Sequence, residues 1–267
     1  MQLKISHLTT YHYDEPVHYS LQQIRLTPCS RSGQQEVINW RTTIEGGVKE
    51  LEFEDQHKNL VMLVSVKDGQ TELSIHSEGE VATTDTSGIV GENGGFAPLW
   101  LFKRPTELTQ PGASINKLVA DLGDEFEGDI QRMHALSRII SETVSYEPGK
   151  THSETTAEEA LQNGHGVCQD HAHIFIAAAR LMDYPARYVS GYLMMDDRVE
   201  QEASHAWAEA HLPGVGWVGF DVSNDISPDE RYVRIATGLD YKEAAPISGL
   251  RFGDSDESMI VSLQVQQ

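Results

Sequence analysis

The segment 167–182 constrains the fold of this chain more than any other feature, because it is apolar on nearly all sides of a helix. A helix on the surface of a domain keeps one polar face, whereas a helix that is apolar all round is buried. Arg180 interrupts the run, and nowhere do about 18 or more apolar residues follow one another, the length that crosses a bilayer. The sequence therefore predicts a buried helix at the centre of a globular domain.

The segments around this helix indicate an α+β domain. Apolar residues at helical spacing predict three shorter helices before it, and alternating patterns predict strands after it. Helices followed by strands favour a central helix packed on a mostly antiparallel sheet. The predicted helices cover 114–122, 129–144 and 156–161, and the predicted strands cover 187–194, 204–212, 216–222, 232–237 and 258–265.

The N-terminal third of the chain has the period-two alternation that is typical of strands. Runs at 2–13, 37–44, 49–53, 60–67 and 71–81 are separated by short turns containing Gly, Asn or Asp. They predict an antiparallel β-domain like a sandwich. Residues 83–95 lack periodicity and carry Thr, Ser, Asp and Gly, which is typical of a linker. We therefore expect a β-domain over 1–85, a linker or loop over 86–111 and an α+β domain over 112–267.

The charge of the chain excludes two classes of partner. It has 20 Lys and Arg residues against 41 Asp and Glu residues, a formal net charge of −21. Such a surface repels phosphate backbones and anionic lipids, so neither nucleic acid nor a membrane is expected as a partner. The first residues lack the pattern of a secretory signal, and the two cysteines, Cys29 and Cys168, are far apart in sequence. These features predict a cytoplasmic protein without a disulfide framework.

Cys168 begins the predicted central helix, directly after a turn that contains Gly164 and Gly166. A helix N-terminus carries about half a positive charge and free N–H groups, so a thiol there loses its proton more easily and can act as a nucleophile. The same N–H groups can stabilise an oxyanion. A lone cysteine on an apolar helix is also compatible with simple packing. Its position alone leaves both interpretations open.

Two neighbouring predicted strands carry a candidate base and a group to orient it. His205 and Trp207 lie on one face of the strand 204–212, and Asp221 lies in the next strand. If the hairpin pivots on Gly214, residues whose numbers sum to 428 face each other. His205 and Asp221 are then diagonal neighbours, about 7 to 8 Å apart at the backbone. The same register gathers the apolar residues of both strands on the opposite face, so packing and chemistry agree.

Three motifs contain these residues: Gly-Val-Cys-Gln-Asp at 166–170, Ser-His-Ala-Trp-Ala-Glu at 204–209 and Gly-Trp-Val-Gly-Phe-Asp-Val-Ser-Asn at 216–224. In this combination the chain resembles the bacterial transglutaminase-like cysteine peptidases of the papain-like superfamily. Segments 185–192 and 238–246 resemble further parts of that family. Residues 1–85 resemble its bacterial N-terminal β-region, so the resemblance covers nearly the whole chain.

The resemblance implies a papain-like catalytic domain over 112–267, in which a central helix packs on an antiparallel sheet. It implies that Cys168 is the nucleophile, His205 the general base and acid, and Asp221 the residue that orients His205. The implied activity is that of a cysteine protease or amide hydrolase, with a peptide or protein as substrate and a thioester as intermediate. Family members commonly have Pro-Thr after the aspartate, where this chain has Val222 and Ser223.

Two further residues are candidates for substrate binding. Gln169 follows the nucleophile and is placed to shape the acyl site, and Trp207 shares a strand face with His205. A Trp on a strand is also compatible with a position in the core. Cys29 in the β-domain has no assigned role.

Other activities remain compatible with the same residues. A protein-glutamine transglutaminase or deamidase uses the same triad with an amine or water as acceptor. A non-catalytic binding module on this fold is also compatible with the sequence. Among partners, the sequence is compatible with a second copy of the chain in a homo-oligomer. A metal-dependent hydrolase is disfavoured, because His171 and His173 stand two apart on a helix and point in different directions. The chain also contains no His-Glu-x-x-His motif. We expect no metal and no cofactor.

Overall fold

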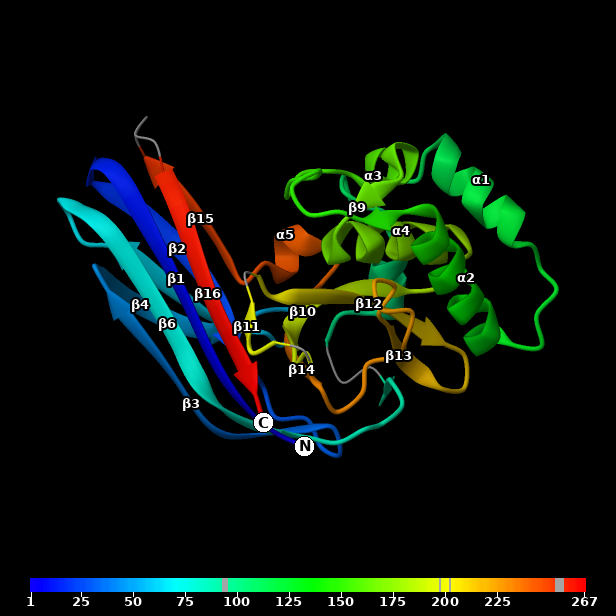
Figure 1. Ribbon diagram of the computed structural model, residues 1–267, viewed down its shortest axis with the longest axis horizontal. Helices are drawn as coiled ribbons and strands as arrows, with labels where there is room; N and C mark the ends of the chain where they lie inside the picture. The colour runs from blue at the N-terminus through cyan, green and yellow to red at the C-terminus, as the bar shows by residue number, and fades with distance from the viewer. Residues whose placement is uncertain (93–95, 197, 202, 253–256) are drawn as a thin grey trace.

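In the N-terminal third of the chain, strands whose residues are alternately buried and exposed build most of two antiparallel sheets. These sheets pack face to face (Figure 1). The computed structural model describes residues 1–92, 96–196, 198–201, 203–252 and 257–267. The strand orders are β11-β16-β1-β6-β3 and β15-β2-β5-β4. The N-terminal strands are β1 (Gln2–Val17), β2 (Tyr19–Thr27), β3 (Gln35–Glu45), β4 (Gly47–Glu54), β5 (Leu60–Val66) and β6 (Gln70–Thr83).

The core between the two sheets confirms the predicted sandwich. Tyr11 and Leu73 from one sheet and Ile24 and Val64 from the other belong to a single buried cluster. The sequence did not predict strand β2. The reason is that β2 directs polar residues such as Ser20 inward next to its apolar ones, so it lacks a clean hydrophobic alternation.

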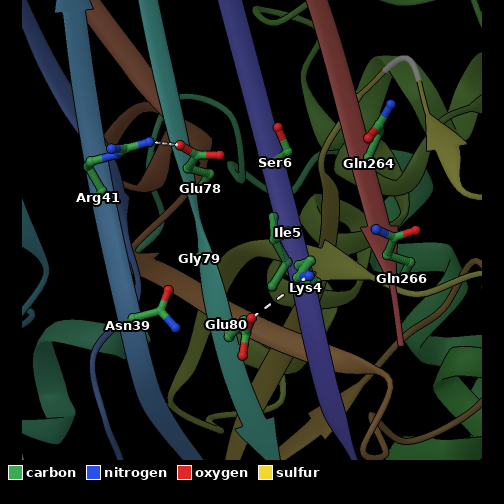
Figure 2. Close-up of a pocket in the computed structure, with 10 residues that line it drawn as sticks. All are labelled: Lys4, Ile5, Ser6, Asn39, Arg41, Glu78, Gly79, Glu80, Gln264 and Gln266. Carbon is green, nitrogen blue, oxygen red and sulfur yellow. Dashed lines mark hydrogen bonds and ion pairs between the residues drawn. The ribbon is translucent and has the colours of Figure 1, made fainter.

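The outer face of the five-stranded sheet is polar. Its side chains surround a hollow of about 420 Å³ that lies across β1, β6 and β3 (Figure 2). Arg41 pairs with Glu78 and Lys4 with Glu80 across this face. The sheet packs against the core on one side only, so its other face is in contact with water and carries polar side chains.

The C-terminal strands correct the predicted domain boundary at 112–267. β15 (Ile247–Phe252) pairs with β2, and β16 (Glu257–Gln266) pairs with β1 in a register that joins Ile5 to Val265. In space these strands complete the two N-terminal sheets, and the chain ends lie side by side (Figure 1). The alternation in 258–265 predicts a strand and its buried face, but it does not identify the neighbouring strand.

The predicted linker 86–111 also contains regular structure. β7 (Ile89–Gly91) pairs with β13 (Gly216–Phe220), and a 3₁₀-helix covers Leu99–Lys103 and buries Phe102. Residues 93–95, which the linker prediction includes, lie outside the described residues. A three-residue strand is too short for its periodicity to be recognised in a sequence.

The second region is built on an antiparallel sheet of order β14-β10-β12-β13-β7, as predicted for the strands after the central helix. Ala208 pairs with Phe220 and Ala210 with Val218, which is the register in which paired residue numbers sum to 428. The sheet contains β10 (Ala186–Leu193), β12 (His205–Leu212) and β14 (Tyr232–Gly238) besides β7 and β13, and β11 (Glu200–Gln201) precedes β12 and pairs with β16.

The predicted central helix forms as α4 (Cys168–Leu181). From Asp170 to Arg180 every one of its residues is buried, and it packs against the alanine face of β12. Small side chains on that face let helix and strand approach closely. The surrounding elements are α1 (Ala113–Leu122), α2 (Asp129–Thr143), β8 (Ser145–Tyr146), α3 (Ala157–Asn163), β9 (His165–Gly166) and α5 (Tyr241–Ala244). The protein therefore has the expected α+β fold (Figure 1).

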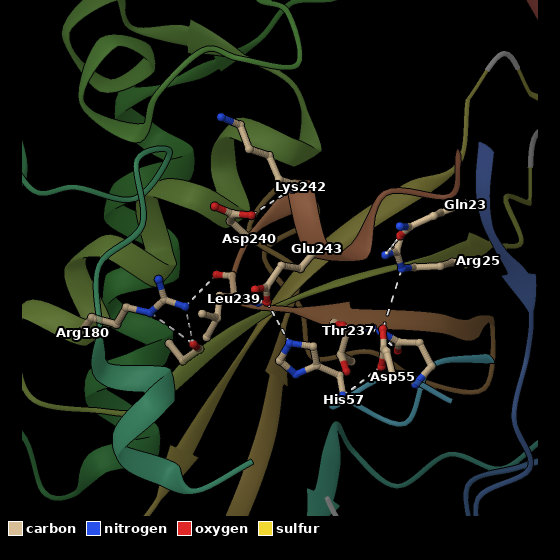
Figure 3. A network of polar contacts seen from close by, with 12 residues as sticks. Gln23, Arg25, Asp55, His57, Arg180, Thr237, Leu239, Asp240, Lys242 and Glu243 are labelled. Atoms are coloured by element: carbon tan, nitrogen blue, oxygen red, sulfur yellow. Dashed lines mark hydrogen bonds and ion pairs between the residues drawn. The ribbon is translucent and has the colours of Figure 1, made fainter. Parts of the chain in front are cut away.

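Polar contacts hold the two regions together. The side-chain amide of Asn59 donates to the carbonyl of Thr237 over 2.7 Å and accepts from the Thr237 N–H over 2.8 Å. It thus forms the hydrogen bonds to the backbone that a neighbouring strand would form at the edge of β14. The Nε2 atom of His57 lies 2.8 Å from Oε2 of Glu243 (Figure 3). Within the second region, Arg180 of α4 donates to the carbonyl of Leu239 over 2.6 Å. Within the described part of the chain, no helix is long and apolar enough to span a membrane.

Candidate active site

Cys168 is the first residue of α4, and its position follows from the turn that precedes it. Gly164 ends α3 with a φ of 71°, a left-handed conformation that favours glycine. Oδ2 of Asp170 then accepts hydrogen bonds from the Val167 N–H and from Oγ1 of Thr151, each over 2.7 Å. Asp170 thus caps the helix. Its burial, which outweighs these hydrogen bonds, raises its pKa above the ordinary value.

His205 begins β12 and reaches Asp221 on the same face of the sheet. Its Nε2 atom donates to Oδ2 of Asp221 over 2.6 Å, and the two side chains are 8% and 0% exposed. The side chain of Cys168 lies close enough to the same imidazole to raise its pKa. Because Nε2 is engaged with Asp221, Nδ1 is the nitrogen left for the thiol. The structure brings together the three residues predicted as a triad.

The electrostatics of these groups favour a charged imidazole. Burial by itself lowers the pKa of His205, but its hydrogen bond with Asp221 and its electrostatic interactions with Asp221 and Cys168 outweigh burial and raise the pKa to about 10. Burial likewise opposes ionisation of Asp221. Hydrogen bonds from His205, Asn224 and Tyr232 outweigh that effect and hold the pKa of Asp221 below its ordinary value. At neutral pH the site therefore contains an imidazolium between two acidic groups.

Two residues that the sequence analysis did not single out complete the environment of Asp221. The hydroxyl of Tyr232 and the side-chain amide of Asn224 each donate to Oδ2 over 2.7 Å. Asn224 follows Asp221 in the third motif, which is the one sequence signal for its role. Tyr232 lies on β14, which is not adjacent to β13 in the sheet, so no local pattern connects it to Asp221.

Ser223 stands where family members commonly have Thr. Its Oγ atom lies 2.8 Å from Nδ1 of His171, and Nε2 of that histidine lies 3.0 Å from the carbonyl of Val144. His173 is fully buried and its Nε2 accepts from the Tyr241 N–H over 3.1 Å. Both histidines have structural hydrogen-bond partners. Among the residues described here, no group of three or more His, Cys, Asp or Glu side chains is arranged to hold a metal ion.

The two predicted substrate-binding residues lie in different environments. Gln169 is partly exposed beside Cys168, and its amide donates to the carbonyl of Ser153 over 3.2 Å. Trp207 is only 3% exposed, stacks on His205 with ring centroids 6.4 Å apart and packs edge-on against Tyr232. Trp207 therefore supports His205 from the core, in place of the predicted position in a substrate cleft.

The fold and these side chains together define a papain-like α+β protein with a Cys–His–Asp arrangement at the N-terminus of a buried helix. Residues 117–222 match the family described as the transglutaminase-like superfamily, and residues 3–82 match the bacterial transglutaminase-like N-terminal region. The chain belongs to the transglutaminase-like superfamily.

Relatives share nearly the full length of the chain. An uncharacterized protein of Mycobacterium tuberculosis (strain H37Rv) is 30% identical over 291 residues, which cover 98% of this chain and 91% of the relative. One from Mycobacterium leprae is 28% identical over 276 residues, covering 99% and 98%. A crystal structure described as "a Putative Cysteine Protease from Cytophaga hutchinsonii" has the same fold, with a TM-score of 0.79, 24% identity and coverage of 100% of this chain and 91% of that chain.

Proposed function

We propose that this protein is a cysteine-dependent hydrolase of amide or peptide bonds in peptide or protein substrates. The observation that carries the proposal is the hydrogen bond between His205 and Asp221 with Cys168 beside the same imidazole, whose pKa is raised to about 10. An imidazolium beside a thiol favours the thiolate, which is the nucleophilic form. The solved structure of the same fold is described as "a Putative Cysteine Protease", and this description supports the proposal.

In the proposed reaction, the Cys168 thiolate attacks the carbonyl carbon and the negative charge moves to the carbonyl oxygen. The N–H of Cys168 at the start of α4 has no partner within the helix and can donate to that oxyanion. The C–N bond then breaks, and Nδ1 of His205 gives its proton to the departing amine. A thioester on Cys168 and a neutral imidazole remain.

Water completes the reaction. Neutral His205 removes a proton from a water molecule, the resulting hydroxide attacks the thioester carbonyl, and the carboxylic acid leaves as Cys168 regains its thiolate. Asp221 keeps the ring oriented through both steps, because its Oδ2 atom holds Nε2. The reaction needs no cofactor. A reducing compartment such as the cytoplasm, which we infer as the location, would keep the unpaired thiol of Cys168 available.

Product analysis tests the proposal. A mixture of peptides containing internal glutamine is incubated with the protein in the presence of a primary amine and followed by mass spectrometry. Hydrolysis predicts new peptide termini or glutamate in place of glutamine, and Cys168→Ser abolishes either product. Products that contain the added amine would identify a transglutaminase instead. No Cys168-dependent product of any kind would favour a non-catalytic binding module.

A further inference from the structure

A second cavity, of about 490 Å³, lies away from Cys168 where the two regions of the fold meet. Its walls come from the segments 29–34 and 54–58 of the β-region, from Arg187 at the start of β10, and from Val90, Glu92, Ala97 and Phe102. Glu209, the strand partner of Arg187, is four residues from His205 along β12, about 13 Å at roughly 3.3 Å per residue. The cavity is therefore separate from the proposed acyl-transfer site, and an inference about it does not depend on that proposal.

The deep wall of this cavity is positively charged. Arg187 is 7% exposed; its guanidinium carbon lies 3.9 Å from the ring centre of Trp217, and its Nε donates to Glu209 over 2.7 Å. Glu209 is completely buried and also pairs with Arg234, which is 7% exposed. One carboxylate thus serves two buried guanidinium groups.

Arg31 adds a third cation to the same place. It is partly buried and lines the cavity with Arg187, and its guanidinium makes no hydrogen bond to any residue that the structure describes. Burial and the nearby positive charge of Arg187 lower the pKa of Arg31 to about 10, so both groups stay charged at neutral pH. The guanidinium groups of Arg31, Arg187 and Arg234 therefore lie near a single buried carboxylate, that of Glu209.

The surplus of buried positive charge is unusual for this protein, whose formal net charge is −21. A buried charge is costly unless it is paired, and acidic residues are plentiful in this sequence. The acidic side chains that line the cavity, Glu54 and Glu92, are exposed at its rim, where Lys58 also lies. Arg234 lines a smaller neighbouring cavity, so the site itself is formed by Arg31 and Arg187. These features leave the guanidinium groups available to a ligand.

We propose that this cavity binds a small molecule through an oxyanion group, a phosphate or a carboxylate, held between Arg31 and Arg187. The planar guanidinium fork matches both anions and binds them by paired, charge-assisted hydrogen bonds. Arg187 is already fixed by Trp217 and Glu209, so it presents its terminal nitrogen atoms in one orientation. Binding would pair the surplus charge and would stabilise the contact between the two regions.

Titration of the full-length protein with inorganic phosphate and with succinate, at constant ionic strength in sodium chloride, tests this site by calorimetry and by thermal unfolding. We expect saturable binding of at least one anion and a rise in Tm. Arg31→Gln should weaken that binding by about tenfold or more. Arg41→Gln, on an arginine that is 73% exposed on β3, is the matched control and should leave it unchanged. The anion that binds more tightly shows whether the ligand's oxyanion group is a phosphate or a carboxylate.

The same variant separates a ligand role from a structural one. Because the Arg31 guanidinium holds no described residue by a hydrogen bond, Arg31→Gln should not lower Tm in the absence of anion. A decrease of several degrees without anion would show that Arg31 is structural and would overturn the proposal. So would equal effects of Arg31→Gln and Arg41→Gln, or no saturable binding of either anion.

Discussion

His205 and Asp221 are joined by a hydrogen bond of 2.6 Å from Nε2 to Oδ2. The pairing of Ala208 with Phe220 fixes the register of β12 and β13, and that register places the two side chains on one face. Because this hydrogen bond engages Nε2, Nδ1 is the ring nitrogen left to meet the thiol of Cys168. The orientation of the base is therefore a consequence of how two strands pair.

Replacement of Asp221 by Asn should leave the imidazole without its anionic partner. We expect the pKa of His205 to fall and Cys168-dependent turnover to decrease by about 10³- to 10⁴-fold, as for other triads. Turnover and circular dichroism would be measured together. Asp229→Asn, which removes a carboxylate paired with Arg231, is the matched control and should keep nearly full activity. Equal losses in both variants would contradict the role of Asp221.

The hydroxyl of Tyr232 should contribute to the site through Asp221. Tyr232→Phe removes a donor at 2.7 Å from Oδ2, so the carboxylate loses one of the hydrogen bonds that keep it ionised. We expect a loss of about 1 kcal/mol in stability and about tenfold in turnover. Tyr184→Phe, which removes a hydroxyl bonded to Asp129, should affect stability only. A Tyr232→Phe variant with unchanged turnover would show that Asn224 and His205 suffice.

Gly166 should tolerate no side chain, because a Cβ there would lie 2.7 Å from Cβ of Asp170. Gly166→Ala should displace Asp170 and weaken the cap of α4, at a cost of about 1 to 3 kcal/mol. Urea unfolding measures the free energy. Gly128→Ala is the control, since a Cβ at Gly128 meets no atom within 4 Å. Equal stability of the two variants would contradict a tight contact between Gly166 and Asp170.

The free energy of unfolding should depend on pH through His205. Its pKa is raised from 6.5 to about 10 on folding, so its contribution is fully present below about pH 6.5 and is lost as the pH rises through 10. Wild-type stability should therefore fall between pH 6 and 10 by on the order of a few kcal/mol more than that of His205→Gln. Denaturant unfolding at both pH values measures the difference. Parallel pH profiles of the two proteins would contradict a charged His205.

The sequence was sufficient to predict what depends on local patterns. The apolar run at 167–182 predicts the buried helix, and the alanine face of β12 with Val218 and Phe220 predicts the register that brings His205 to Asp221. Both follow from hydrophobic periodicity, which the structure must satisfy to bury its core. Cys168 was placed in the same way, at the start of the helix.

Features that depend on distant segments were not predicted. β16 joins β1 although the two are separated by nearly the whole chain, and alternation specifies the face of a strand but not its neighbour. Tyr232 reaches Asp221, and Trp207 enters the core, through packing between strands that the sequence pattern does not order. Arg31 and Arg187 meet in one cavity for the same reason.

Alkylation of the native protein with iodoacetamide at about pH 6 tests whether Cys168 is an activated thiolate, because an unperturbed thiol of pKa about 8.5 is almost entirely protonated there. Intact mass and peptide mapping locate and time the label. We expect fast, single modification at Cys168 that slows sharply in His205→Ala, while Cys29 serves as the internal control. A Cys168 that reacts no faster than a free thiol in the folded protein, or at the same rate in His205→Ala, would contradict a Cys168–His205 pair.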